Sequence, residues 1–218
     1  MAADTMTSMT TASRPFFSRQ ARLLLKVSFL VTFAEAMLVP MYAAFTEKVG
    51  GSILDAAIAY GVFSIATGLV IGLVGTRPIF ERHTRRFLIG GFLGSVACDV
   101  AYVFVQNKWQ LFVAQVVAGL ASGLIEPAWD SLFTEGIEQS PAKHWSIWAG
   151  GTHLLSGLAA FAGGLIVVCS SFSVLFISMA SIDLLAVLLC WRGGLHEATR
   201  GSEAAEPAAV ASLSRASG

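Results

Sequence analysis

Charged residues are scarce in this chain. Of its 218 residues, 13% are charged and 55% are hydrophobic, and the mean hydropathy is +0.70. A soluble domain carries about 25% charged residues, so most of this chain cannot form a water-facing surface, whereas it can form a lipid-facing one. Fourteen basic residues balance fourteen acidic ones, so net charge gives no indication of nucleic-acid binding.

Motifs for metal binding and catalysis are also lacking. The sequence contains no His-Glu-x-x-His pattern, and Ser156-Gly157 beside His153 on one apolar segment is a poor imitation of a serine-protease site. The cysteines form no Cys-x-x-Cys pair and are interpreted as small packing residues. We therefore expect no enzyme activity, no cofactor and no metal site. The three cysteines are Cys98, Cys169 and Cys190.

Six long apolar runs predict an all-α membrane protein with six transmembrane helices. About 20 residues cross a bilayer, and each run comes close to that length. Residues 1–21 are expected to be a flexible basic tail, residues 22–192 a six-helix bundle, and residues 193–218 a disordered tail. The predicted spans cover residues 23–45, 53–74, 87–105, 111–133, 145–168 and 172–191.

The distribution of basic residues predicts the orientation. With six spans and the N-terminus in the cytoplasm, twelve lysines and arginines lie inside and two, Lys48 and Lys108, lie outside. Both termini should then be cytoplasmic, in the plasma (inner) membrane. The inner set is Arg14, Arg19, Arg22, Lys26, Arg77, Arg82, Arg85, Arg86, Lys143, Arg192, Arg200 and Arg215.

Small residues cluster within the spans. The fourth contains the run at 118–123, Ala-Gly-Leu-Ala-Ser-Gly, and the fifth contains Gly150-Gly151, Gly157 and Gly163-Gly164. Small residues three or four apart let helix backbones approach closely, so we expect a tightly packed bundle.

Apart from Asp55 at the edge of the second span, five carboxylates fall within the predicted spans without a lysine or arginine mid-span to neutralise them. Each costs roughly 2.5–3.5 kcal/mol at the bilayer centre on insertion scales. Either some are protonated, or they face water, or they bind a cation. The five are Glu35, Asp99, Glu126, Asp130 and Asp183.

Two of these carboxylates are candidates for binding a substrate or a proton. Glu35 lies mid-way along the first span, before Pro40, which can bend the helix. Glu126 precedes Pro127, and Asp130 lies one turn further on the same helix face. We expect Glu35 and Glu126 to take part in function. The alternative is that they form only structural hydrogen bonds.

The remaining polar residues favour structural roles. Asp130 lies nearer the basic end, and we expect it to pair with an arginine there. Asp99 and Asp183 are interpreted as contacts between helices, and His153 as a packed or hydrogen-bonded residue rather than a proton relay.

The basic segment 77–86, Arg-Pro-Ile-Phe-Glu-Arg-His-Thr-Arg-Arg, resembles a motif of major facilitator transporters. In that family the loop between the second and third spans reads Gly, three residues, Asp, Arg, any residue, Gly and two basic residues. Glu81, Arg82 and the pair Arg85-Arg86 match its charges, while Arg77 and Thr84 stand where the glycines belong.

Other segments extend the resemblance over residues 22–192. Residues 38–42 and 49–52 are similar to the end of the family's first helix and its outer loop, and residues 111–123 resemble its fourth helix. Gln115 stands where the family often has an arginine that serves proton coupling in some members. Residues 159–164 are similar to its antiporter pattern, with alanines in place of Gly-Pro.

The resemblance implies roles for several residues. Glu81, Arg82, Arg85, Arg86 and Asp130 would form a charge network that holds the transporter in one access state. Substrate and coupling ion would bind near mid-membrane against helices one and four, which points to Glu35 and Glu126. The implied function is secondary transport of a small molecule, coupled to H⁺.

Members of this family are normally built from two six-helix halves, and these residues correspond to one N-terminal-type half. Three interpretations stay open: a parallel homodimer, a pairing with a separate second-half polypeptide, or a truncated transporter fragment. The alternative function is a non-transporting scaffold or assembly subunit.

Overall fold

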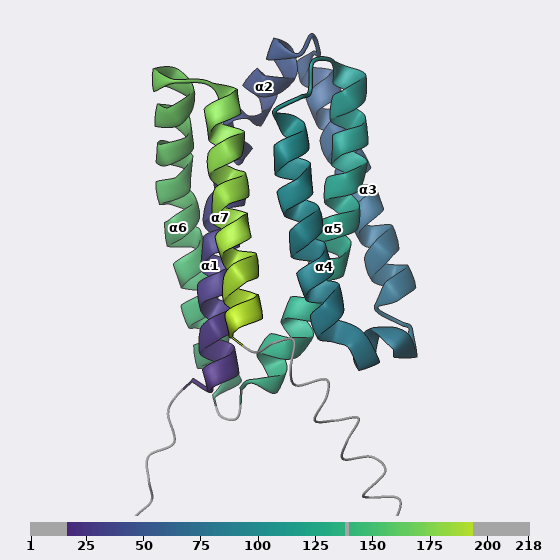
Figure 1. Cartoon of the computed structure of the whole chain (residues 1–218), viewed down its shortest axis with the longest axis vertical. Helices are drawn as coiled ribbons and strands as arrows, with labels where there is room; N and C mark the ends of the chain where they lie inside the picture. Colours follow the sequence, from purple (N-terminus) through teal and green to yellow (C-terminus); the bar gives the residue numbers. More distant parts are fainter. Residues whose placement is uncertain (1–16, 138–139, 194–218) are drawn as a thin grey trace, which may run out of the picture.

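The computed structural model describes residues 17–137 and 140–193, and every regular element within them is helical (Figure 1). The remaining parts of the two predicted tails, residues 1–16 and 194–218, lie outside the described residues. The helices are α1 (Arg19–Leu38), η1 (Val39–Met41), α2 (Tyr42–Lys48), α3 (Ile53–Val74), α4 (Pro78–Tyr102), α5 (Lys108–Glu135), α6 (Pro141–Cys169) and α7 (Phe172–Arg192).

Five of the described helical segments are long and apolar enough to cross a membrane. They are Arg19–Lys48, which combines α1, η1 and α2, and the helices α3, α5, α6 and α7. Helix α4 differs because every 18-residue stretch of it contains Arg85, Arg86 and at least one further charged residue. The all-helical membrane architecture is therefore confirmed, while the span at residues 87–105 stays a prediction.

Helix boundaries follow from capping residues. At the start of α3, the Ser52 hydroxyl accepts a hydrogen bond from the Asp55 N–H (3.2 Å), and the Asp55 carboxylate accepts one from the Ser52 N–H (2.8 Å). This reciprocal capping box satisfies two backbone donors that would otherwise lack partners. Asn107 caps α5 and Ser171 caps α7 in the simpler way.

The basic segment 77–86 is helical rather than a loop. Pro78 occupies the first turn of α4, where its missing N–H costs nothing. The helix is broken only at His83, whose φ of −127° and ψ of 23° are not helical. The connection between α3 and α4 is thus shorter than expected, and the basic residues project from helical turns. Pro40, by contrast, has the predicted local effect, because it lies in the 3₁₀ turn η1.

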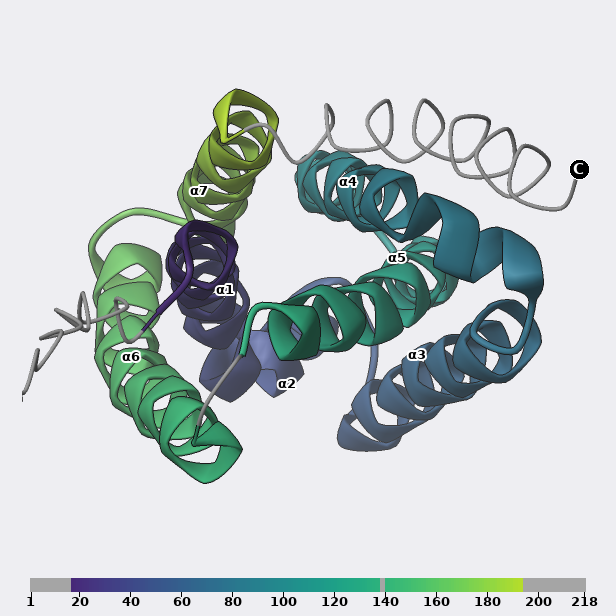
Figure 2. The same ribbon diagram turned by 90° about the horizontal axis from the view of Figure 1, so that it is seen from below.

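The helices form one bundle in which α1 and α5 lie between α3 and α6 (Figure 2). Helix α1 packs on α6 and α7, and α5 packs on α3 and α4. Helices α4 and α7 pack on each other, with α4 also against α5 and α7 also against α1, and they form one side of the bundle. The beginning of α1 and the end of α7 lie at the same end of the bundle (Figure 1).

Glycines permit the closest contacts between these helices. A Cβ at Gly163 on α6 would collide with the Met37 carbonyl on α1, and one at Gly119 on α5 would lie 2.5 Å from the Phe63 carbonyl oxygen on α3. One turn from Gly119, a Cβ at Gly123 would lie 2.9 Å from the Thr67 carbonyl oxygen. The prediction of tight packing at small residues is confirmed at these positions.

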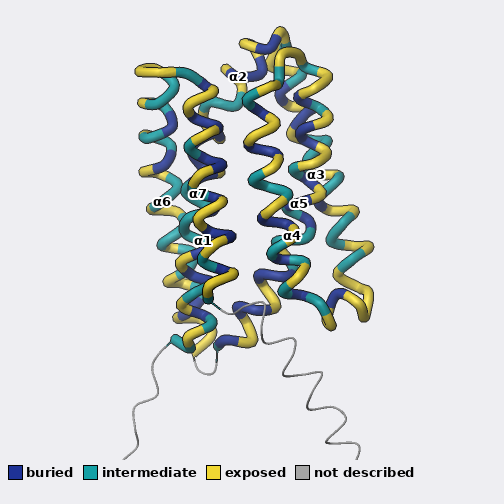
Figure 3. Tube along the Cα trace, viewed as in Figure 1, coloured by how far each residue is buried: buried dark blue, intermediate teal, exposed yellow. Residues whose placement is uncertain are grey.

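The core and the outer surface are both apolar. One buried cluster includes Leu24, Leu88 and Phe133, and a second includes Phe45 and Phe176. The residues in these clusters face into the bundle (dark blue in Figure 3), while many exposed positions are large hydrophobic side chains. Large apolar side chains on the outside suit lipid as the surrounding solvent. Examples of the exposed set are Leu69, Leu73, Leu154, Phe161 and Val168.

Replacing Gly119 by alanine should destabilise the bundle. The added methyl group would force α3 and α5 apart, and overpacking of this kind costs typically about 1–3 kcal/mol. Thermal unfolding of the purified protein in detergent measures the effect. The matched control is Gly90→Ala on α4, where an added Cβ has nothing within 4 Å. Equal effects of the two substitutions would contradict the packing at Gly119.

Cysteine labelling tests the orientation. Thr76 and Lys48 are both exposed and lie at opposite ends of the bundle. In a Cys169→Ser background, Thr76→Cys should react with a membrane-impermeant maleimide only from the cytoplasmic side, and Lys48→Cys only from outside. The buried Cys98 and Cys190 should stay silent in both variants. Labelling of both new cysteines from one side would contradict the predicted topology.

Candidate functional site

Glu35 and Glu126 come together from different helices. Glu35 lies on α1, one turn before η1, and Glu126 lies in α5 immediately before Pro127. Both side chains are exposed in this bundle. Each is close enough to the other to interact electrostatically, and Glu35 also interacts with Asp183 on α7. Asp99 on α4 interacts with Glu35 as well, so the structure links four of the five intramembrane carboxylates that the sequence singled out.

Asp130 extends this acidic group toward the end of the bundle that carries most of the basic residues. It is exposed and interacts electrostatically with Glu126, one turn earlier on α5. Among the residues that the structure describes, no arginine forms an ion pair with it. The expected partnership of Asp130 with the basic segment is therefore absent from this conformation.

Arg85 instead connects the basic segment to the bundle through an amide. Its guanidinium donates to the Gln20 Oε1 atom on α1 (3.2 Å), and the Gln20 amide donates to the Leu132 carbonyl oxygen on α5 (3.0 Å). This chain of two hydrogen bonds ties α4, α1 and α5 together. Neither the sequence pattern nor the motif indicated Gln20, because nothing local to residue 20 marks it as a contact.

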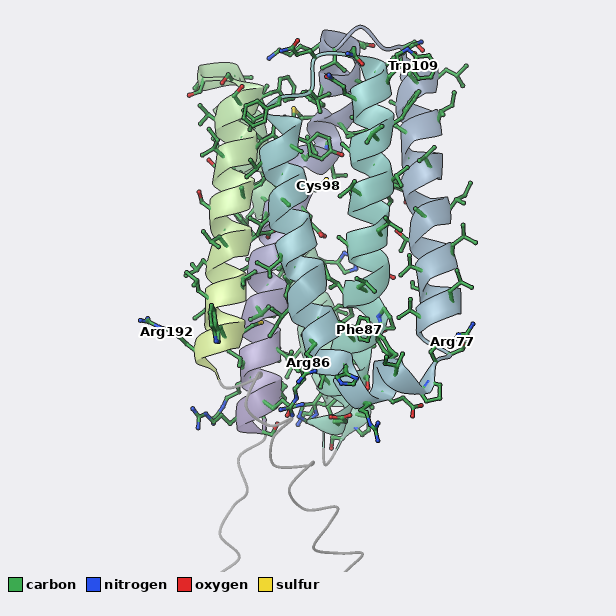
Figure 4. All side chains as sticks on the ribbon, turned by 45° about the vertical axis from the view of Figure 1, so that its right-hand side comes forward. Arg77, Arg86, Phe87, Cys98, Trp109 and Arg192 are labelled. Carbon is green, nitrogen blue, oxygen red and sulfur yellow. The ribbon has the colours of Figure 1, made fainter. Side chains whose placement is uncertain are left out.

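The other arginines of the basic segment and its glutamate are exposed. Glu81, Arg82 and Arg86 project from the first turns of α4. Arg77, Arg86 and Arg192 lie at the same end of the molecule (Figure 4), away from Trp109 at the opposite end. The basic residues are therefore concentrated at one end of the bundle, as their positions in the sequence predict.

Gln115 is buried and anchors the short helix α2. Its amide donates a hydrogen bond to the Tyr42 hydroxyl. Gln115 is a neutral side chain, and its described polar contact is with another neutral group. It fixes α2 to α5 and adds no charge to the centre of the bundle.

Asp183 and Asp99 are buried on α7 and α4. The Ser95 hydroxyl on α4 donates to the Asp183 Oδ2 atom (3.1 Å), so the interpretation of Asp183 as a contact between helices is confirmed. His153, which was expected to be packed or hydrogen-bonded, is exposed on α6. The sequence could not pair Asp99 with Asp183, since they approach only through the packing of α4 on α7.

An ion pair fastens the opposite end of the bundle. The Lys108 ammonium at the start of α5 lies 3.2 Å from Asp55 Oδ1 on α3. Asp55 lies at the edge of its span and also caps α3, so it forms part of a surface contact and not of the central carboxylate group. Within residues 17–137 and 140–193, no set of three or more His, Cys, Asp or Glu side chains is arranged to hold a metal ion.

These features define the class of the protein, which is a membrane protein built as a bundle of several membrane-spanning helices. Carboxylates lie between its helices, and basic residues lie at one end. The family model "Major Facilitator Superfamily" matches residues 24–216. The chain therefore belongs to the Major Facilitator Superfamily, a family of membrane transporters and not of enzymes. It is also similar to the "Uncharacterized MFS-type transporter YitZ" of Bacillus subtilis (strain 168), with 23% identity over 169 residues, which cover 74% of this chain and 99% of the relative.

Removing the Arg85 side chain should loosen the basic end. Arg85→Ala deletes a hydrogen bond from a charged donor and leaves Gln20 without that partner, which should cost about 1–3 kcal/mol. The matched control is Arg86→Ala, because Arg86 is exposed and has no hydrogen bond to a described residue. Thermal unfolding should distinguish the two variants. A melting temperature that falls equally in both would contradict a specific role for Arg85.

Proposed function

We propose that this chain is one six-helix half of a proton-coupled secondary transporter for a small molecule. In this proposal α4 is the third span, although its charged residues set it apart from the other five. Its packing against α5 and α7 supports this assignment. The charges Glu81, Arg82, Arg85 and Arg86 are confined to the first turns of α4, so the rest of the helix can lie in the bilayer.

We place the protein in the plasma (inner) membrane with both of its termini in the cytoplasm. The positive-inside rule supports it. Nine of the basic residues that belong to the described part of the chain fall at the end where α1 begins and α7 ends, against Lys48 and Lys108 at the other end.

Glu35 and Glu126 are the proposed binding residues for the proton or the substrate. Helix α1 packs on α6 and α7, and α5 packs on α3 and α4, yet Glu35 on α1 and Glu126 on α5 are both exposed. Two exposed carboxylates that are close enough to interact suit a site that a proton or a cationic substrate neutralises. Their electrostatic interaction is the observation on which the proposal chiefly rests.

The basic end is proposed to control access. The hydrogen bonds from Arg85 to Gln20 and from Gln20 to the Leu132 carbonyl join three helices at one end of the bundle. Breaking these bonds would free that end during a rocking motion between halves. Glu81, Arg82 and Arg86 are exposed and available to a second bundle, and Asp130 is the proposed acidic member on α5.

A second six-helix bundle is the proposed partner, either another copy of this chain or a separate second-half polypeptide. Glycines line α3 and α6 at spacings of four and seven residues, which place each set on one helix face. An added Cβ would meet nothing within 4 Å at any of them, so these faces can take close helix contacts from outside. The glycines are Gly61, Gly68 and Gly72 on α3, and Gly150, Gly157 and Gly164 on α6.

A non-transporting scaffold, or a truncated fragment, is the competing function. It needs the small-residue packing but not the ionisable groups at Glu35 and Glu126. The two functions therefore differ in their tolerance of neutral substitutions at these positions.

Neutralising Glu35 or Glu126 should abolish uphill transport. In sealed inverted vesicles with an imposed proton gradient, the wild-type protein should accumulate members of a panel of small organic cations, ethidium among them. Glu35→Gln and Glu126→Gln should reduce accumulation to the passive leak, because an amide cannot load and release a proton. Fluorescence quenching follows the accumulation.

The matched control is Glu47→Gln, an exposed carboxylate on α2 outside the proposed site. It should leave accumulation unchanged, and all variants should reach the membrane in equal amounts. Full activity of both Glu35→Gln and Glu126→Gln would contradict the proposed site. Absence of any transport by the wild-type protein would favour the scaffold or fragment.

A further inference from the structure

The interface between α4 and α7 contains two acidic side chains that face each other's helix. Ser95 and Asp99 lie four residues apart on α4, so both project from the same face of that helix. The Ser95 hydroxyl donates to the Asp183 carboxylate on α7, which shows that this face is turned toward α7. Asp99 interacts electrostatically with Asp183.

These two carboxylates are almost completely removed from solvent. Asp183 is 1% exposed and Asp99 is 6% exposed. One oxygen of each, Asp183 Oδ1 and Asp99 Oδ2, is buried without a hydrogen-bond partner among the described residues. An ionised carboxylate in such a place is costly unless something neutralises it, so the structure requires a compensating positive charge or proton.

The surrounding helices offer no fixed positive charge. No lysine, arginine or histidine of the described residues forms an ion pair with either aspartate. Glu35 on α1 also interacts electrostatically with both aspartates, and it too is acidic.

The other titratable groups around the pair are neutral when protonated. Cys98 and Tyr102 on α4 interact with Asp99. The Cys98 thiol donates a hydrogen bond to the Ala114 carbonyl oxygen on α5 (3.4 Å). Tyr102 also interacts electrostatically with Tyr42 of α2. On α6, His153 is exposed.

We propose that Asp99 and Asp183 form a proton-binding site within the α4–α7 interface. Loading adds one proton from water to a carboxylate oxygen and changes no other bond. The proton turns an orphaned acceptor into a donor, and the remaining carboxylate supplies an acceptor for it. The site differs from Glu35 and Glu126 in its helices and in its burial, although both aspartates lie within electrostatic range of Glu35.

A proton fits this position better than a larger ligand. The burial of both side chains leaves no room for a small-molecule substrate to touch them, and in the described residues no three acidic, His or Cys side chains are placed to share a metal ion. A monovalent cation such as Na⁺ normally draws on several oxygens, whereas one buried oxygen on each aspartate lacks a hydrogen-bond partner among the described residues.

Proton occupancy of this site affects α1. Glu35 lies within electrostatic range of both Asp183 and Asp99, so a change of charge on the pair acts on a carboxylate of the proposed transport site. This consequence rests on the proposed function, whereas the existence of the buried site does not.

Infrared spectroscopy tests the site directly on the full chain in lipid. A Glu35→Gln background removes the overlapping signal of Glu35, and the carbonyl-stretch band of protonated carboxylic acids is recorded at neutral pH. We expect a band that decreases in Asp99→Asn and in Asp183→Asn. Ser95→Ala should shift the band without removing it, because the Ser95 hydroxyl bonds to Asp183. Asp55→Asn, at the Lys108 ion pair, should leave it unchanged.

Two outcomes overturn the proposal. An unchanged band in both Asp99→Asn and Asp183→Asn means that neither aspartate holds a proton. A band that disappears on adding NaCl at constant pH, with no response to KCl, means that Na⁺ occupies the site instead. Should either asparagine variant fail to fold, Ser95→Ala assigns the band instead, because the Ser95 hydroxyl bonds to Asp183, and a band that does not shift in Ser95→Ala then counts against the site. None of these results depends on transport activity.

Discussion

Close contact between helix backbones is the interaction on which this structure depends. In lipid the hydrophobic effect does not drive helices together, so association rests on packing and polar contacts. Gly163 lets α6 reach the Met37 carbonyl on α1, and Gly119 and Gly123 let α5 approach α3. These contacts hold α1 and α5 between α3 and α6, and that arrangement brings Glu35 beside Glu126.

The charged groups of the bundle fall into three environments. Glu35 and Glu126 are exposed on the central helices, where water or a ligand can reach them. Asp99 and Asp183 are enclosed between α4 and α7, where only a very small species fits. The arginines gather at one end, where Arg85 reaches other helices through Gln20. This separation lets one chain combine an accessible acidic site, a buried acidic pair and a basic end that can open.

Local sequence signals were sufficient for most of the helices. The predicted span at residues 53–74 is the helix α3. The Ser52–Asp55 capping box marks where this helix begins, and its apolar composition marks it as a membrane span. The basic segment was misread because its charges resemble a loop, although Pro78 at the first helical position is a helix-start signal. The charges of Arg85 and Arg86 also explain why α4 lacks the hydropathy of the other spans.

The contacts between helices were beyond the reach of sequence patterns. The carboxylates could be identified as costly, but the pairing of Asp183 with Ser95 and the approach of Asp99 depend on the register between α4 and α7. The same holds for Gln20, which bridges Arg85 to Leu132 across three helices. Glycine patterns predicted that helices pack closely, but they did not indicate which helix faces would be left without a neighbour. The faces that carry Gly68 on α3 and Gly157 on α6 are left in this way.

The mass of the intact assembly tests most directly the claim that this bundle is one half of a two-bundle transporter. Native mass spectrometry of the full chain, released from lipid nanodiscs under gentle conditions, gives that mass. The account predicts twice the mass of the chain, or the mass of the chain plus one other membrane polypeptide. A strictly monomeric protein, at every protein-to-lipid ratio and with nothing co-purifying, would contradict it.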